Sequence, residues 1–223
     1  MAIKPRTIRL PDKTTVSALW LKPPAAKACL VLAHGAGAGM RHPFLAAMAR
    51  GLADRGVATW RYEFPYMLAR ARRIDPPAVL HDAVRAAVSQ AREAAPDLPV
   101  IAGGKSMGGR MTSRAQAERP LAGVSALAFL GFPLHPSGKP AVTRAEHLGG
   151  VDLPMLFVQG TRDTLAELPL LEPILARLPR ATLHVVDGAD HAFHVLKRSG
   201  RTDRQVIDEL ADSVAEWGAV HAR

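Results

Sequence analysis

Residues 100–110 read V-I-A-G-G-K-S-M-G-G-R, and this stretch decides the fold. The apolar run from Leu98 to Ala102 leads into the pattern G-x-S-x-G, which is centred on Ser106, and a helical segment follows. Strand, sharp turn and helix form the context in which such a serine stands clear of a sheet as a nucleophile. Gly104 and Gly108 fit this geometry because side chains there would collide with the neighbouring strand and helix. The stretch therefore predicts a nucleophile elbow, with the backbone N–H of Met107 at the start of a helix as an oxyanion donor.

The sequence Gly104-Lys105-Ser106 also resembles the end of a phosphate-binding loop. That motif requires a glycine where Pro99 stands, and four loop residues where Val100 to Ala102 have the composition of a strand. The nucleotide-binding interpretation is therefore disfavoured.

The remaining apolar runs predict a mostly parallel, twisted sheet. Two strand-like runs, Thr7 to Leu10 and Val16 to Leu21, are joined by a Pro11-Asp12 turn and predict antiparallel N-terminal strands. Continuous apolar runs then alternate with segments of helical spacing, which is typical of strands covered by helices on both faces. These runs are Cys29 to Ala33, Val57 to Trp60, Leu98 to Ala102, Val124 to Leu130, Met155 to Val158 and Leu183 to Val186.

Helix signals separate these runs. Residues 43–55 and 79–95 carry apolar residues at helical spacing, and Thr202-Asp203-Arg204-Gln205 is typical of a capping box that opens a C-terminal helix. There is no internal repeat and no long linker. We therefore expect residues 1–223 to form a single α/β domain built on an open sheet.

A serine nucleophile needs a histidine base and a carboxylate that orients it. Asp163 follows the run from Met155 to Val158, and His191 follows the run from Leu183 to Val186, so both should lie at the same sheet edge as Ser106. The other candidates for the acid and for the base are less suitable. Asp152 precedes its strand, Asp187 is a further candidate, and Asp190 adjoins the histidine too closely; His194 is assigned to the surface or to packing.

These motifs resemble those of a known family. The G-x-S-x-G elbow, the G-T-x-D loop at 160–163 and the G-A-D-H-x-F loop at 188–193 are similar to those of the α/β-hydrolase superfamily, particularly its small dienelactone-hydrolase-like branch. The matching pieces run from about residue 28 to 194. The order Ser, Asp, His is also that of the superfamily. The resemblance implies an α/β-hydrolase fold and a second oxyanion donor just after His34-Gly35, at the backbone N–H of Ala36; His34 is expected to brace this loop.

The sequence departs from that branch at the nucleophile. Dienelactone hydrolases proper use cysteine where this chain has Ser106, which weakens the transfer of their lactone substrate. The segment between Phe132 and Met155 has only about twenty residues, too few for a helical cap. We therefore expect no cap domain and an open site.

Several apolar side chains are candidates for the wall of a substrate pocket. They follow predicted strands on the reactive edge, and they either contact substrate or belong to the core. They are Phe64, Tyr66, Phe132, Leu165 and Phe193. Lys105 and Arg110 flank the elbow and either favour an anionic substrate or point to solvent.

The predicted chemistry is acyl transfer to water, in which Ser106 attacks a small ester with His191 as base and Asp163 as orienting acid. No cofactor is required, and no two histidines have the spacing of a metal site. The alternative is a non-catalytic α/β-hydrolase domain that acts as an interaction or scaffold module.

Composition narrows the possible partners and compartment. The formal net charge is +9, but the arginines are scattered and lack interleaved aromatics, so nucleic-acid binding is disfavoured. The single cysteine, Cys29, lies in an apolar run and needs no oxidising compartment. The N-terminus has no continuous apolar segment, so we expect a soluble cytoplasmic protein without membrane insertion. The sequence leaves the oligomeric state open.

Overall fold

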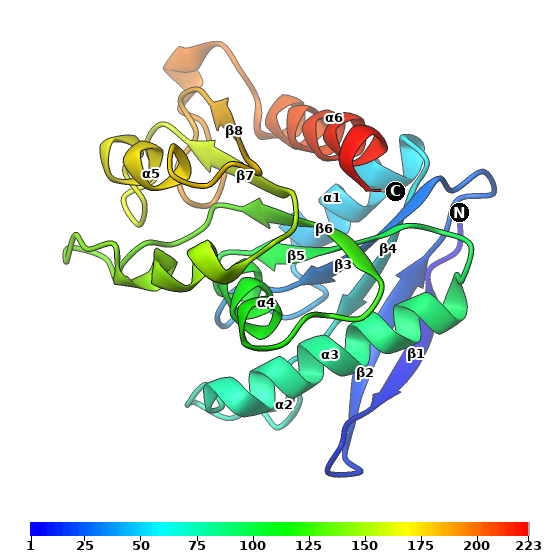
Figure 1. The fold of residues 1–223 in the computed structure, drawn as a ribbon. Helices are drawn as coiled ribbons and strands as arrows, with labels where there is room; N and C mark the ends of the chain where they lie inside the picture. The colour runs from blue at the N-terminus through cyan, green and yellow to red at the C-terminus, as the bar shows by residue number, and fades with distance from the viewer. Residues whose placement is uncertain (223) are drawn as a thin grey trace.

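The structure, a computed structural model, describes residues 1–222 and contains an eight-stranded sheet in the order β1-β2-β4-β3-β5-β6-β7-β8 (Figure 1). The strands β1 and β2 form an antiparallel pair, and β2 is antiparallel to β4. All other neighbours in the sheet are parallel. The strands are β1 Lys4–Arg9, β2 Thr15–Leu21, β3 Ala28–Ala33, β4 Val57–Tyr62, β5 Val100–Lys105, β6 Val124–Leu130, β7 Met155–Gly160 and β8 Ala181–Val186. This arrangement confirms the predicted fold class.

Helices cover both faces of this sheet, as expected. They are α1 Pro43–Asp54, α2 Pro65–Leu68, α3 Pro77–Ala94, α4 Met107–Glu118, α5 Leu168–Leu175 and α6 Asp203–His221, with the 3₁₀ helices Thr143–Gly150 and Lys197–Ser199. In Figure 1, α1 and α6 lie together on one face, and α3 and α4 lie on the other. None of the helices in the described chain combines the length and apolar character needed to cross a membrane.

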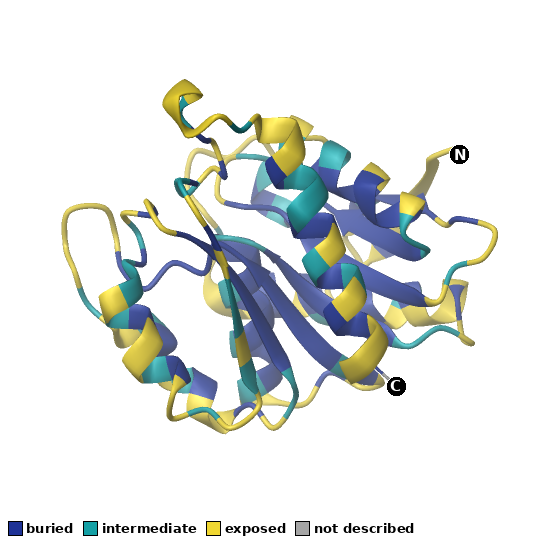
Figure 2. Ribbon diagram, turned by 90° about the horizontal axis from the view of Figure 1, so that it is seen from above, coloured by how far each residue is buried: buried dark blue, intermediate teal, exposed yellow. Residues whose placement is uncertain are grey.

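The central strands are buried because helices cover them from both sides. Every residue of β3 and β4 is buried, whereas the edge strands β1 and β8 are partly exposed (Figure 2). Cys29 in β3 is fully buried, and this burial raises the pKa of its thiol to about 12. The thiol is therefore a packing group rather than a nucleophile at neutral pH.

The local signals of the sequence predict the start of α6 but not the helices α2 and α5. The capping box of α6 forms as predicted: the Thr202 Oγ1 atom accepts from the Gln205 N–H at 3.2 Å, and Gln205 Oε1 accepts from the Thr202 N–H at 2.8 Å. The short helices α2 and α5 were not anticipated. Pro173 inside α5 interrupts the sequence pattern of a helix because proline lacks an N–H donor.

No helical cap is inserted over the sheet between β6 and β7. Residues 131–154 contain only loops and the 3₁₀ helix Thr143–Gly150. Since the strands from β3 onward are parallel, the loops after β5, β7 and β8 meet at one edge of the sheet.

Candidate active site

Ser106 lies at the sharp turn between β5 and α4. Its φ is 51° and its ψ is −117°, a left-handed conformation that few residues other than glycine adopt. The turn is held by a hydrogen bond of 3.0 Å from the Ser106 N–H to the Leu130 carbonyl of β6. This strained turn puts Ser106 at the N-cap of α4, where the residue is partly exposed at the sheet edge.

The close approach of backbones around this turn explains the flanking glycines. A Cβ atom on Gly104 would lie 2.5 Å from the Ala33 carbonyl oxygen, and one on Gly108 would lie 2.5 Å from the His34 carbonyl oxygen. Such contacts with backbone cannot be relieved by rotating a side chain.

We expect Gly104→Ala to lower the free energy of unfolding by about 1–3 kcal/mol, because the added methyl group overpacks the contact between β5 and β3. The measurement is urea denaturation followed by circular dichroism. Gly149→Ala is the matched control, since a Cβ atom there meets nothing within 4 Å. Equal stabilities of the two variants would contradict the close-packed elbow.

Two further side chains reach Ser106 from neighbouring loops. His191 Nε2 lies 2.8 Å from Ser106 Oγ, and His191 Nδ1 lies 2.7 Å from Asp163 Oδ2. His191 follows β8, and Asp163 follows β7. The carboxylate can only accept, so it holds the imidazole proton on Nδ1 and leaves Nε2 free to accept the serine proton.

The carboxylate is itself held in place by neighbours. The Nε2 group of Gln159 donates to Asp163 Oδ2 at 2.5 Å, and the Leu165 N–H donates to Asp163 Oδ1 at 2.8 Å. Gln159 is fully buried, and its Oε1 atom accepts from the Phe132 N–H. Sequence reasoning missed Gln159, although a polar residue at the end of a buried strand was a signal available for it.

The rival acids and the second histidine have other partners. The side chain of Asp190 accepts from the N–H groups of Ala192 and His194, and Asp187 accepts from the Thr161 hydroxyl. His194 pairs with Asp203. Within residues 1–222, Asp163 is the carboxylate that bonds His191.

The glycine-rich loop after β3 lies against the serine. A Cβ atom on Gly35 would lie 3.7 Å from Ser106 Cβ, so this loop packs directly on Ser106. His34 braces it: Nδ1 donates to the Gly35 carbonyl at 2.7 Å, and Nε2 accepts from the Phe64 N–H at 3.0 Å. Burial lowers the pKa of His34, which favours the neutral ring that this pair of bonds requires. In the described chain, the N–H of Ala36 makes no hydrogen bond, and Ala36 is an exposed residue.

The five candidate pocket residues have different surroundings in the structure. Phe132 packs with Phe129 and Phe157 in the core, while Phe64 and Tyr66 pack around His34. The Tyr66 hydroxyl accepts from the Gly37 N–H at 3.2 Å and so supports the glycine-rich loop.

The two remaining candidates lie closer to Asp163 and His191 along the chain. Phe193 is buried and stacks on Phe44, whereas Leu165 is half-buried. Contact of all five side chains with a substrate stays a prediction.

A second serine–histidine pair joins α4 to the 3₁₀ helix Thr143–Gly150. Ser113 Oγ is 2.7 Å from His147 Nε2. Ser113 is fully buried, and within the described residues no carboxylate bonds His147. Burial and the nearby Arg114 and Arg110 lower the pKa of His147 to about 4. The pair therefore lacks both access for a substrate and an orienting acid.

The two basic residues beside the elbow have different surroundings. Lys105 does not extend into solvent, because its Nζ donates to the carbonyl oxygen of His191 at 2.6 Å. Arg110 is partly buried in the first turn of α4; burial lowers its pKa to about 10, and Arg144 and Arg114 add like charge.

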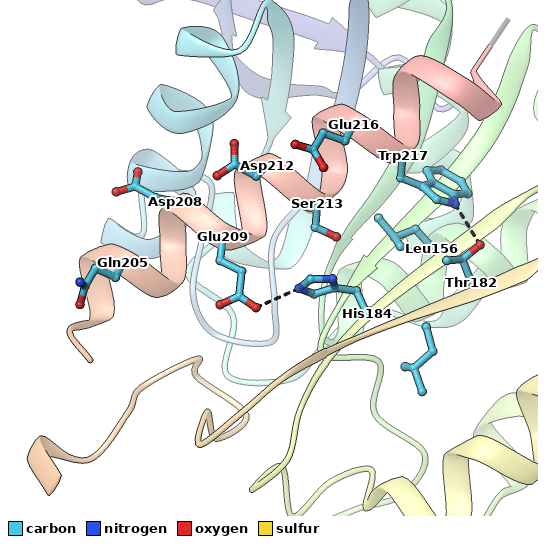
Figure 3. A pocket seen from close by; sticks show the side chains of 11 residues that line it. Leu156, Thr182, His184, Gln205, Asp208, Glu209, Asp212, Ser213, Glu216 and Trp217 are labelled. Carbon is cyan, nitrogen blue, oxygen red and sulfur yellow. Dashed lines mark hydrogen bonds and ion pairs between the residues drawn. The ribbon is translucent and has the colours of Figure 1, made fainter. Parts of the chain in front are cut away.

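A separate groove of about 550 Å³ lies between α6 and the edge strand β8 (Figure 3). Several of its polar groups pair with each other: His184 bonds Glu209, and the Trp217 indole N–H donates to Thr182 Oγ1 at 3.0 Å. None of Ser106, Asp163 and His191 lines it. The groove is distinct from the candidate active site.

Comparison with known proteins agrees with this architecture. Residues 26–219 match a family model described as an alpha/beta hydrolase domain. Among solved structures, the chain is similar to a dienelactone hydrolase from Anabaena variabilis, with 21% identity over 100% of this chain and 99% of that one and a TM-score of 0.78. It is also similar to an α/β serine hydrolase without lid from Xanthomonas campestris, with 20% identity, coverage of 97% and 95% and a TM-score of 0.74. A third similar structure is the esterase domain of a Rhodothermus marinus protein, with 17% identity, full coverage of both chains and a TM-score of 0.73. The family model covers most of the sequence, and the chain therefore belongs to the α/β-hydrolase domain family.

Proposed function

We propose that this chain is a serine hydrolase that cleaves small carboxylic esters through an acyl-enzyme on Ser106. The observation that carries the proposal is the continuous chain of hydrogen bonds from Ser106 through His191 to Asp163. Membership of the α/β-hydrolase family supports hydrolysis in general. The ester bond is our inference from the nucleophile and from the open site.

In the first half of the reaction, Ser106 Oγ forms a bond to the ester carbonyl carbon while His191 Nε2 takes the hydroxyl proton. The carbonyl oxygen gains negative charge, and we assign its stabilisation to the backbone N–H groups of Met107 and Ala36. Each such donor contributes about 3 kcal/mol to the transition state. Asp163 stabilises the imidazolium that forms.

The tetrahedral intermediate then collapses. The bond to the alcohol breaks, and the proton on His191 Nε2 passes to the leaving alkoxide. A water molecule next gives a proton to His191 and attacks the acyl carbon. Collapse of the second intermediate releases the carboxylic acid and returns the proton to Ser106.

We expect short acyl chains to be cleaved best, because no cap covers the site and most of the nearby aromatic side chains are already packed in the protein. A long chain would then leave most of its apolar surface in water and gain little binding energy. The measurement is kcat/KM for p-nitrophenyl esters from acetate to decanoate, with Ser106→Ala as the background. A clear optimum at decanoate would contradict the open site, and no hydrolysis of any ester above background would contradict the ester assignment.

A further inference from the structure

We propose that Lys105 is a positioning residue, whose ammonium group holds the loop of His191 against the nucleophile elbow. The inference rests on the proposed function of Ser106 and His191. Lys105 is the last residue of β5 and directly precedes the serine. Its Nζ donates to the His191 carbonyl oxygen at 2.6 Å and lies 5.3 Å from the centre of the Phe193 ring.

This contact is one of very few between the two loops. Within residues 1–222, the hydrogen bonds that join residues 100–110 to residues 187–196 are that of Lys105 and that between Ser106 and His191. The other hydrogen bonds of residues 187–196 run within this loop, to the end of β8, to residues 161–163 after β7, or to residues 199–203 before and at the start of α6. An example is the bond from the Arg162 N–H to the Ala189 carbonyl at 2.9 Å. Lys105 therefore connects the loop to the elbow without depending on the reacting atoms.

The histidine loop needs such support because part of it is strained. Phe193 has a φ of 63°, which is unfavourable for a residue with a bulky side chain and costs about 1–3 kcal/mol. Its ring stacks on Phe44 of α1 at 5.7 Å on one side and has the Lys105 ammonium near it. An ammonium near an aromatic ring is attracted to it, which adds to the hydrogen bond.

The backbone leaves room for the ammonium. Gly131 has a φ of 66°, and a Cβ atom there would lie 2.9 Å from Lys105 Nζ and 3.5 Å from both Asp163 Oδ2 and His191 Nδ1. The ammonium, the carboxylate and the imidazole thus border the same point. A larger residue at position 131 would displace the lysine.

The strength of the hydrogen bond from Lys105 Nζ to the His191 carbonyl should depend on pH. The titratable groups that face it are Asp163, from the loop after β7, and Asp190 and His191, from the loop after β8. Burial lowers the pKa of Lys105 to about 8, although Asp163 and Asp190 oppose this shift. A hydrogen bond from a charged donor is roughly twice as strong as one from a neutral donor. The contact is therefore strongest below pH 8 and weakens as the pH rises through that value.

The test compares Lys105→Met with the wild type and with Lys139→Met, in which an exposed lysine of the loop after β6 is replaced. At pH 7 we expect Lys105→Met to lower kcat for p-nitrophenyl acetate by about 10- to 100-fold, because a misplaced base costs rate. KM should change little, since the Lys105 ammonium is bonded to the His191 carbonyl and its expected role is to place the base rather than to bind substrate. At pH 9.5 the deficit of Lys105→Met should become smaller, because the wild-type lysine has then lost its charge. Lys139→Met should behave as wild type at both values.

A second readout does not depend on turnover. The His191 Nδ1 proton that is bonded to Asp163 should give a downfield NMR resonance in the wild type, and this resonance should broaden or disappear in Lys105→Met at pH 7. If the variant does not fold, as judged by thermal unfolding, the wild type alone decides: its resonance should weaken between pH 7 and 9.5.

The outcomes separate the two proposals. Unchanged kcat and an unchanged resonance in Lys105→Met, a deficit that is the same at pH 7 and 9.5, or a wild-type resonance insensitive to pH when the variant does not fold would overturn the role of Lys105. Wild type that hydrolyses no ester would instead overturn the proposed function, and the resonance would still test whether Lys105 positions the imidazole.

Discussion

Replacing Ser106 by alanine should lower kcat for p-nitrophenyl acetate by about 10⁴- to 10⁶-fold, because the acyl-enzyme can then no longer form. The variant should remain folded, since alanine removes only the hydroxyl group, and the hydrogen-bond partner of this hydroxyl is His191. Labelling by a fluorophosphonate, which requires an activated serine, should be lost together with the rate. Both measurements report on the same oxygen atom by different chemistry.

Ser113→Ala is the matched control for this experiment. Ser113 lies on α4, the helix that follows Ser106, and it also bonds a histidine, His147. Ser113 is buried, however, and no carboxylate among the described residues bonds His147. We expect Ser113→Ala to retain labelling and most of kcat. Loss of labelling in Ser113→Ala but not in Ser106→Ala would reassign the nucleophile. A folded wild type that is not labelled at all would favour the alternative of a non-catalytic interaction module.

The second large effect is expected for Asp163→Asn, which should lower kcat by about 10⁴-fold. The amide is nearly isosteric with the carboxylate, so the loop should keep its geometry. Its NH₂ group, however, can face the imidazole and favour the tautomer with the proton on Nε2, which cannot accept the serine proton. The charge that stabilises the imidazolium is also lost. Steady-state kinetics at pH 7 to 8 measure the effect.

Asp190→Asn is the control for the orienting acid. Asp190 is adjacent to His191, and its Oδ1 atom accepts from the N–H groups of Ala192 and His194 at 2.8 and 3.0 Å. The asparagine oxygen can accept the same two bonds. We therefore expect a change in kcat of less than about tenfold, because the charge of Asp190 does not contact the imidazole. If Asp190→Asn were the more damaging variant, the acid would have been assigned to the wrong residue.

The positions of the strands along the chain followed from local patterns. Apolar runs of about six residues, separated by helical spacing, can only be buried when helices cover a sheet on both faces, and the predicted runs coincide with β3 to β8 within a few residues. The capping residues of α6 were equally readable, because a cap is satisfied by atoms within one turn of the chain. The helix α5 was not anticipated, since Pro173 interrupts its pattern and its stability comes from Leu171 and Leu175 packing into the core.

The contacts around the candidate site were less accessible to sequence reasoning. The sequence pattern assigns no role to Gln159, yet its amide bonds Asp163 on one side and the Phe132 N–H on the other. The sequence leaves Tyr66 open as a pocket or core residue, whereas in the structure its hydroxyl bonds the glycine-rich loop. Each of these contacts joins segments that become neighbours only when the sheet has formed.

The sequence by itself determined the class of fold, the strand–turn–helix around Ser106 and the short list of candidate groups that could act with this serine. These depend on periodicity, on glycine spacing and on which side chains have the required chemistry. The tertiary structure decided how those groups are held: which acid faces the imidazole, which aromatics are already packed, and that the Lys105 ammonium turns inward to the His191 carbonyl rather than to solvent. The physical reason is the distance along the chain over which each kind of interaction acts. Backbone conformation responds to near neighbours in the chain, whereas the direction of a side chain at the end of a strand is set by burial and by hydrogen bonds to loops many residues away.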